Sequence, residues 1–170
     1  FDAIGSVKVS NMNYSGEGMP AMKVNAMTLN FSPQFVSLEG FDAVMGKSDY
    51  KADGKIENFM QYFFKDSLLK GTFSMRSNTL DLNEFMTEDS TAAVAATDTS
   101  SLSVIEVPSN IDFVLNSSIW NLVYDNLDIK NVKGTVVVRD SKVMLNDLMM
   151  NMLGGSMNMN GSYSTVNPRD

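Results

Sequence analysis

The stretch GSMNMNGSY, residues 155–163, alternates large apolar side chains with small polar ones. Successive side chains of an extended chain point to opposite faces, so Met157, Met159 and Tyr163 share one face. The asparagines and serines between them lie on the other face. This pattern predicts a strand that is apolar on one side and polar on the other.

The same period of two recurs along most of the chain. SDYKADGKIE, residues 48–57, and KGTFSMRS, residues 70–77, each set apolar residues opposite polar or charged ones. Further alternating runs contain Val7 and Val9; Met27, Leu29 and Phe31; Ile111, Phe113 and Leu115; Leu127 and Ile129; and Val143 and Leu145. One run changes phase from Ile119 to Trp120 and Leu122, which indicates a bulge or turn. We therefore expect a mostly β fold of antiparallel meander strands.

Helical patterns are scarce. IENFMQYFFKDSLL, residues 56–69, places Phe59 and Phe63 on one side at a spacing of four. This spacing predicts a short helix near residues 56–65, which would form a lid but not a layer over the sheet. One further helical turn is predicted within residues 81–86.

The chain divides into three predicted segments. Residues 1–86 form a first β unit that contains the short helix, and residues 108–170 form a second β unit, which we expect to continue beyond the given sequence. Between them, residues 87–107 are rich in Ser, Thr and Ala and have too little apolar bulk to bury. Such a composition predicts a flexible linker.

The two β units contain an internal repeat. Shifting residues 28–56 by 107 positions aligns them without gaps with residues 135–163. The identical pairs are Thr28 and Thr135, Val36 and Val143, Leu38 and Leu145, Met45 and Met152, and Gly54 and Gly161. The turn signals FSPQ and RDSK and the strand ends ADG and MNG fall at corresponding places. The sequence therefore predicts a duplicated unit of strand, turn, strand and strand.

Two such units have too few helices to cover their sheet. Two arrangements remain open from the sequence. Either the copies pack face to face as a sandwich, or one curved sheet leaves a groove open for a guest molecule.

The charge and composition exclude several classes of function. The net charge is -7, and no Lys or Arg occurs from Ser77 to Ile129, which argues against binding nucleic acid. Cysteine and histidine are absent, which removes thiolate nucleophiles, Ser-His-Asp triads and structural zinc sites. A hydrolase with a carboxylate pair has no local support in the sequence. We expect a protein that is not an enzyme.

No metal or other cofactor is expected. The methionines near the end of the chain are soft ligands that suit Cu(I), but alternation turns Met149 away from Met150 and Met152. The pair Asp49 and Asp53 before Gly54 has the spacing of two calcium-loop ligands, but Lys51 and Met60 stand where further ligands belong, so we interpret it as a solvated strand end. We interpret the methionines as an apolar strand face that adapts to guests of differing shape.

Two regions resemble a known family. LLKGTFSMRSNTLDLNEFM, residues 68–86, and NVKGTVVVRDSKVMLNDLMMNMLGGSMNMNGSY, residues 131–163, resemble the C-terminal region of AsmA-like proteins of Gram-negative bacteria, particularly those of Bacteroidetes type. The resemblance covers roughly residues 48–168. These are pattern motifs, in which no single residue is diagnostic.

The resemblance implies a periplasmic, non-catalytic protein with a hydrophobic β-groove, whose parent is anchored in the inner membrane. The family is linked to outer-membrane biogenesis and to phospholipid transport between membranes. The expected partners are therefore phospholipid or another acyl-chain lipid, and other repeats of the parent chain. The alternative is a structural or protein-interaction β-module of the cell envelope without bound lipid.

We expect the lipid to contact one apolar face. The residues assigned to it are Val143, Leu145, Leu148, Met150, Met152, Met157 and Met159, together with Phe59 and Phe63 of the short helix. Trp120 and Tyr124 are interpreted as core residues, or as an anchor where the strand changes phase, and not as a ligand platform.

Overall fold

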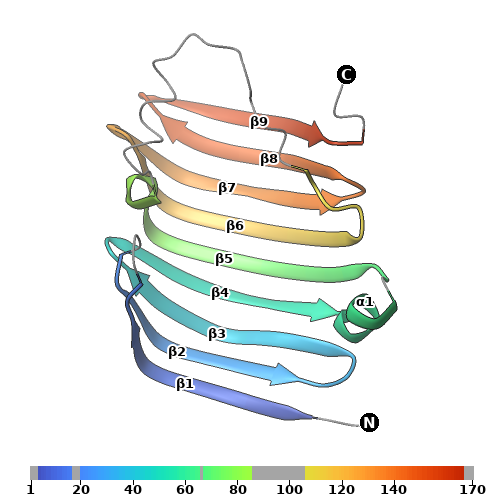
Figure 1. Cartoon of the computed structure of the whole chain (residues 1–170). Coiled ribbons are helices and arrows are strands. Elements are labelled where there is room, and N and C mark those ends of the chain that lie inside the picture. Colours follow the sequence, from blue (N-terminus) through green and yellow to red (C-terminus); the bar gives the residue numbers. More distant parts are fainter. Residues whose placement is uncertain (1–3, 17–19, 66, 86–105, 167–170) are drawn as a thin grey trace.

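All strands that the structure describes belong to one sheet. The computed structural model describes residues 4–16, 20–65, 67–85 and 106–166. Nine strands lie side by side in chain order, from β1 to β9 (Figure 1). The elements are β1 Gly5–Tyr14, β2 Met22–Phe31, β3 Phe35–Met45, β4 Ser48–Glu57, α1 Phe59–Lys65, β5 Leu69–Asp81, the 3-10 turn η1 Leu82–Phe85, β6 Ile111–Tyr124, β7 Leu127–Arg139, β8 Lys142–Met152 and β9 Gly155–Ser164. The predicted β fold is confirmed, as one curved sheet and not a sandwich.

The meander is interrupted once, where β5 and β6 pair in parallel, with Leu69 opposite Ile111. All other neighbouring strands are antiparallel. β5 and β6 therefore begin at the same side of the sheet. Most of the predicted linker, residues 87–107, lies outside the described residues. Its last residue, Val107, is buried, and its N–H donates to Thr165 Oγ1 over 3.0 Å.

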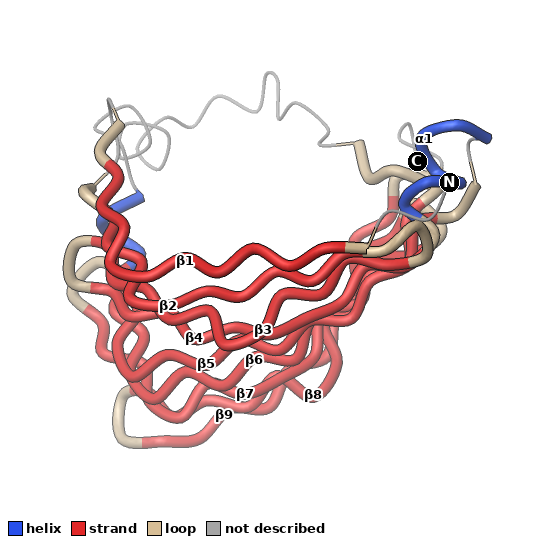
Figure 2. Tube along the Cα trace, turned by 90° about the horizontal axis from the view of Figure 1, so that it is seen from below, coloured by secondary structure: helices blue, strands red, loops and turns tan. Residues whose placement is uncertain are grey.

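The sheet has the profile of a trough when it is seen from its β1 edge, because the strands turn up at both ends (Figure 2). Within the strands, Asn11, Gly40, Asn131 and Asp147 have left-handed backbones, with φ of 53°, 60°, 54° and 50°. A residue in this conformation disturbs the ladder and bends the strand. Four ladders change register: β2 with β3, β3 with β4, β7 with β8, and β8 with β9. These irregularities account for the curvature.

The phase change predicted after Ile119 occurs at a left-handed residue of the neighbouring strand. Ile119 pairs with Val132, but the next residue of each strand, Trp120 of β6 and Asn131 of β7, has no partner in the β6–β7 ladder. Pairing then resumes without a change of register. As a result, the alternation of both strands reverses at this point.

The two predicted repeat copies have the same strand pairing. Three features recur 107 positions apart: the pair Leu38–Gly54 as Leu145–Gly161, the pair Phe41–Ala52 as Leu148–Met159, and the left-handed residue Gly40 as Asp147. The register shift of β3 against β4 therefore recurs in β8 against β9. The strand order and pairing that a duplication requires are present, and both copies lie in one continuous sheet.

The predicted helix is present as α1, but it does not form a lid over the sheet. It lies at the rim of the trough, between the end of β4 and the start of β5, and packs mainly against β5 (Figure 1). Phe63 is 75% exposed. The helix joins adjacent antiparallel strands and has only seven residues, so the chain has no need to cross the sheet. The turn predicted within residues 81–86 is η1.

Candidate functional site

The bend separates a crowded face of the sheet from an exposed one. Leu80, Ile119, Ile129 and Val132 form a buried cluster, with Ile119 only 6% exposed. Ile119 and Val132 lie on one side of the skipped pair of residues in the ladder, and Leu80 and Ile129 lie on the other. Side chains from the two arms of a bent strand approach one another on the concave side of the bend. Trp120, on the opposite side, is 65% exposed. We call the side of the buried cluster the trough face and the opposite side the outer face.

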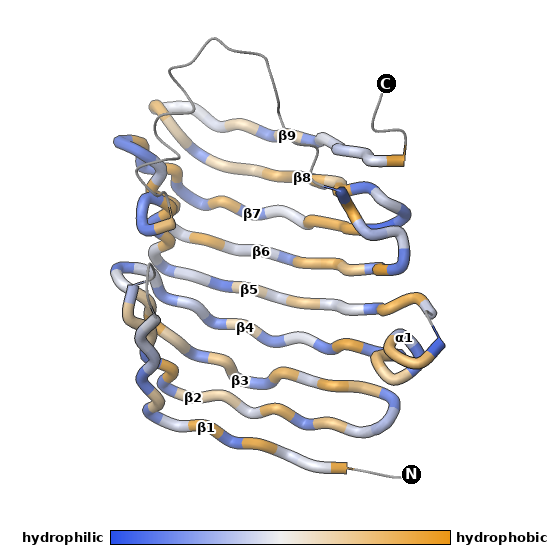
Figure 3. Tube along the Cα trace, in the orientation of Figure 1, coloured by the Kyte–Doolittle hydropathy of each residue, from blue (hydrophilic) through white to orange (hydrophobic). Residues whose placement is uncertain are grey.

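The strand register places the charged side chains of the sheet, with one exception, on the outer face. Residues paired across neighbouring strands share a face, so the ladders extend the assignment from Ile119 to every strand. By this register, every Lys, Arg, Asp and Glu of the nine strands lies on the outer face, apart from Asp147 at its bulge. Apolar residues recur along each strand (Figure 3), and the register places many of them on the trough face. They include Val7, Val9, Val24, Leu29, Val36, Leu38, Ala43, Tyr50, Ile56, Phe73, Met75, Phe113, Leu115, Leu122, Leu127, Val136 and Val138.

The strand residues that the sequence assigned to a guest all share the trough face. Val143, Leu145, Leu148, Met150, Met152, Met157 and Met159 occupy it together, with Met150 opposite Met157 and Leu148 opposite Met159. Leu148, Met150 and Met152 also pack against the buried cluster. Phe59 and Phe63 lie apart from them, on α1 at the rim. The sequence therefore identified one corner of a face that crosses all nine strands.

The trough is wide and lacks a second layer among the described elements. Nine strands spaced at about 4.8 Å span roughly 40 Å along the trough, whose axis crosses the strands. Far from the buried cluster its residues are partly exposed; Val7, Tyr14 and Met157 are 46%, 51% and 42% exposed. Soluble monomers rarely expose a continuous apolar patch larger than a few hundred Å². A face of this size is therefore a candidate binding surface.

The methionines divide between the two faces. Met149 is opposite Lys133 and Asn158, on the outer face, whereas Met150 and Met157 pair on the trough face. Within the described residues, no group of three or more Asp or Glu side chains is placed to hold a metal ion. The chemistry that the trough face supports is non-directional apolar contact.

A carboxylate holds the bend together where β4 and β5 separate. Their ladder ends at the pair Lys51–Arg76, and beyond it Asp49 accepts hydrogen bonds from the N–H groups of Asn78 and Thr79, at 2.9 and 2.7 Å. Burial acts to raise the pKa of Asp49, but the hydrogen bonds from Thr79, Asn78 and Ser77 together lower it below its usual value. One side chain thus replaces part of the missing ladder.

Asp49→Asn is expected to destabilise the sheet by about 1–3 kcal/mol at neutral pH, because an amide is a weaker acceptor for two backbone N–H groups. Since the folded pKa of Asp49 is lowered, its stabilisation is present above the unfolded pKa of about 3.9 and is lost as the pH falls through the folded value. Urea unfolding from pH 7 to pH 3 should therefore show the two proteins converging in acid.

The matched control is Asp53→Asn, on the same strand as Asp49. It removes an exposed ion pair of 3.3 Å between Asp53 and Arg76 of β5. Exposed pairs contribute little, so the free energy of unfolding should change by less than about 1 kcal/mol. A loss at Asp53 equal to that at Asp49 would contradict the role assigned to Asp49.

Comparison with protein-family models, curated proteins and solved structures finds no match for this chain. Among the described helices, none has the length and apolarity needed to cross a membrane.

The interpretation of Trp120 as a core residue was wrong, although Trp120 does lie where β6 changes phase. Its side chain is neither core nor trough but stands on the outer face, 65% exposed. Alternation put Ile119 on the same face as Ile111, Phe113 and Leu115. It could not show to which face the indole of Trp120 would point, because the alternation reverses at that residue. The lining of the outer face around Trp120 was also missed, because its residues come from four separate strands.

Proposed function

We propose that the trough binds the acyl chains of a lipid, with phospholipid as the expected cargo, and performs no catalysis. The observation that carries this proposal is the trough face itself, which is apolar across all nine strands and uncharged apart from Asp147 at its bulge. A face for acyl chains needs no directional contacts and tolerates no unpaired charge. The segregation of strand charges to the outer face meets both conditions.

The energy available is sufficient without any specific motif. Each buried CH₂ contributes about 0.8 kcal/mol, so a chain of about sixteen carbons gains on the order of 12 kcal/mol before entropic costs. The methionines at the β9 end are unbranched and can repack around chains of different shape. A range of acyl chains would thus be accepted.

The wider role follows from the resemblance to AsmA-like proteins. We place the chain in the periplasm, as a segment of a parent protein anchored in the inner membrane of a Gram-negative bacterium. There it would serve phospholipid transport between the membranes and outer-membrane biogenesis. The wide open trough supports this role, since a lipid can enter and leave without the opening of a closed cavity.

Native mass spectrometry of the purified chain tests the proposal. We expect a mass increment that matches phospholipid, confirmed by organic extraction, and binding of a fluorescent fatty acid to the delipidated protein. Absence of both the increment and the fatty-acid binding would reject the proposal.

The second candidate is a structural or protein-interaction β-module of the envelope without lipid, and the β9 edge favours it. Every residue of β9 is exposed, and GSMNMNGSYS has no charge or proline to block the addition of another strand. Natural edge strands usually carry such protection. Lipid-free protein that forms concentration-dependent oligomers in the same spectra would support this candidate.

A further inference from the structure

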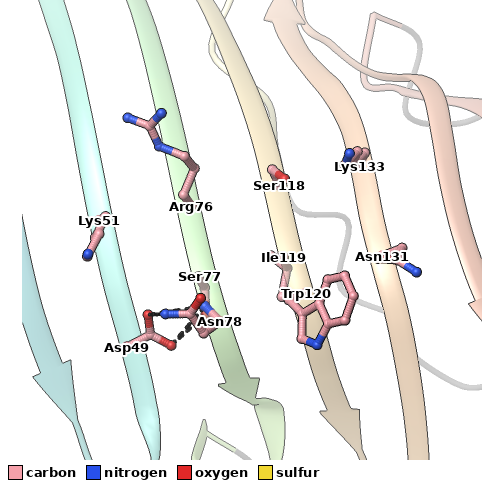
Figure 4. A pocket seen from close by; sticks show the side chains of 10 residues that line it. All are labelled: Asp49, Lys51, Arg76, Ser77, Asn78, Ser118, Ile119, Trp120, Asn131 and Lys133. Atoms are coloured by element: carbon pink, nitrogen blue, oxygen red, sulfur yellow. Dashed lines mark hydrogen bonds between the residues drawn. The ribbon is translucent and has the colours of Figure 1, made fainter.

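A second site lies on the outer face, at the bend. A pocket of about 350 Å³ is lined by residues of β4, β5, β6 and β7 (Figure 4). It faces away from the trough, so lipid binding does not use it. Its lining combines one aromatic ring with cationic and amide side chains.

Trp120 supplies the aromatic wall. It is the only tryptophan of the chain, and it is held outward because the alternation of β6 reverses beside it, opposite the left-handed Asn131. An indole ring has an electron-rich face that attracts partly positive groups. The polarised C–H bonds on one side of a sugar ring fit such a face.

Three cations surround the pocket in a chain whose net charge is -7. Arg76 and Lys51 each have an exposed partner, Asp53 at 3.3 Å and Asp42 at 3.8 Å. Lys133 makes no ion pair with any residue in the described ranges. Exposed ion pairs are weak, so Arg76 and Lys51 remain available to a ligand. Arginine in particular binds phosphate and carboxylate groups through two parallel hydrogen bonds.

The one carboxylate in the lining does not cancel this charge. Asp49 directs its oxygens at the N–H groups of Asn78 and Thr79 and at the side-chain amide of Asn78. Its acceptor sites are therefore engaged within β5. The lining itself carries three cationic side chains and this one carboxylate, with Asn78 and Asn131 beside them as partners for hydroxyl groups.

We infer that this pocket binds a sugar that carries a phosphate or carboxylate group. The ring stacks on Trp120, the anionic group lies between Arg76 and Lys133, and the asparagine amides contact ring hydroxyls. A neutral sugar lacks the charge contact and a free anion lacks the stacking surface, so each should bind more weakly. The inference does not depend on the lipid-binding proposal.

The fluorescence of Trp120 reports on this pocket alone, because the chain has no other tryptophan. The intact chain is titrated at low ionic strength with glucose 6-phosphate and with glucuronate, and separately with glucose and with inorganic phosphate. We expect a saturable change with an anionic sugar, at a concentration roughly tenfold below that needed for glucose or phosphate. No saturable change, or equal binding of phosphate alone, would overturn the inference.

Variants separate the pocket from general charge effects. Arg76→Gln and Lys133→Gln should each weaken binding of the anionic sugar by roughly tenfold, and Trp120→Ala should abolish it in calorimetry. Lys142→Gln removes an exposed outer-face cation of β8 that does not line the pocket, and should leave binding unchanged. An equal loss with Lys142→Gln would show non-specific charge attraction and overturn the inference. Circular dichroism of each variant checks folding, and Arg76→Gln and Lys133→Gln decide the matter if Trp120→Ala unfolds.

Discussion

Replacing Met157 and Met159 together by aspartate should weaken acyl-chain binding by at least roughly tenfold and leave the sheet folded. Both side chains lie on the trough face of β9 and are 42% and 38% exposed, so the new carboxylates stay hydrated in the free protein. An acyl chain lying on them would remove that water, at a cost of several kcal/mol. Titration with a fluorescent fatty acid measures the binding, and the melting temperature measures the folding.

The matched control is Asn158→Asp with Asn160→Asp, which adds the same charge to the same strand on the outer face. Aspartate at 160 keeps the oxygen that accepts the N–H of Asp147 over 2.8 Å. Binding should change by no more than about twofold. If both pairs of substitutions weaken binding alike, the effect is one of net charge and not of the trough face. If the methionine variant unfolds, the two methionines are packed core and the assigned face is wrong.

Ile119→Ala should produce the largest loss of stability, roughly 2–5 kcal/mol. Ile119 is 6% exposed at the inside of the bend, where Leu80, Ile129 and Val132 pack around it. Because the described strands form a single layer, none of them can move in from a second sheet to fill the cavity. Urea unfolding followed by far-ultraviolet circular dichroism gives the free energy of unfolding.

Trp120→Ala is the informative comparison, since it removes a larger side chain from the next residue. Trp120 is 65% exposed on the outer face, so the substitution should change the free energy of unfolding by no more than about 0.5 kcal/mol. A larger loss at Trp120 than at Ile119 would mean that the assignment of the two faces is inverted.

The local and compositional properties of this protein could be predicted from its amino-acid sequence. Alternation with a period of two fixed which residues share a face within each strand, and it placed Met157 and Met159 together and the asparagines of β9 opposite them. It also indicated the irregularity after Ile119 and the repeat of 107 positions. These features could be predicted because they depend on near neighbours in the chain or on a direct comparison of two segments.

The shape of the sheet and the direction of Trp120 depend on contacts between strands that are distant in sequence. The choice of one open sheet over a sandwich depends on which strands meet, including the parallel pairing of β5 with β6 across a long connection. The reversal that turns Trp120 outward depends on Asn131, which is its neighbour only after β6 and β7 have paired. Likewise, Asp49 of β4 accepts hydrogen bonds from backbone N–H groups of β5, a contact between residues about thirty positions apart. Contacts between residues far apart in sequence have no local period, so only the folded sheet could reveal them.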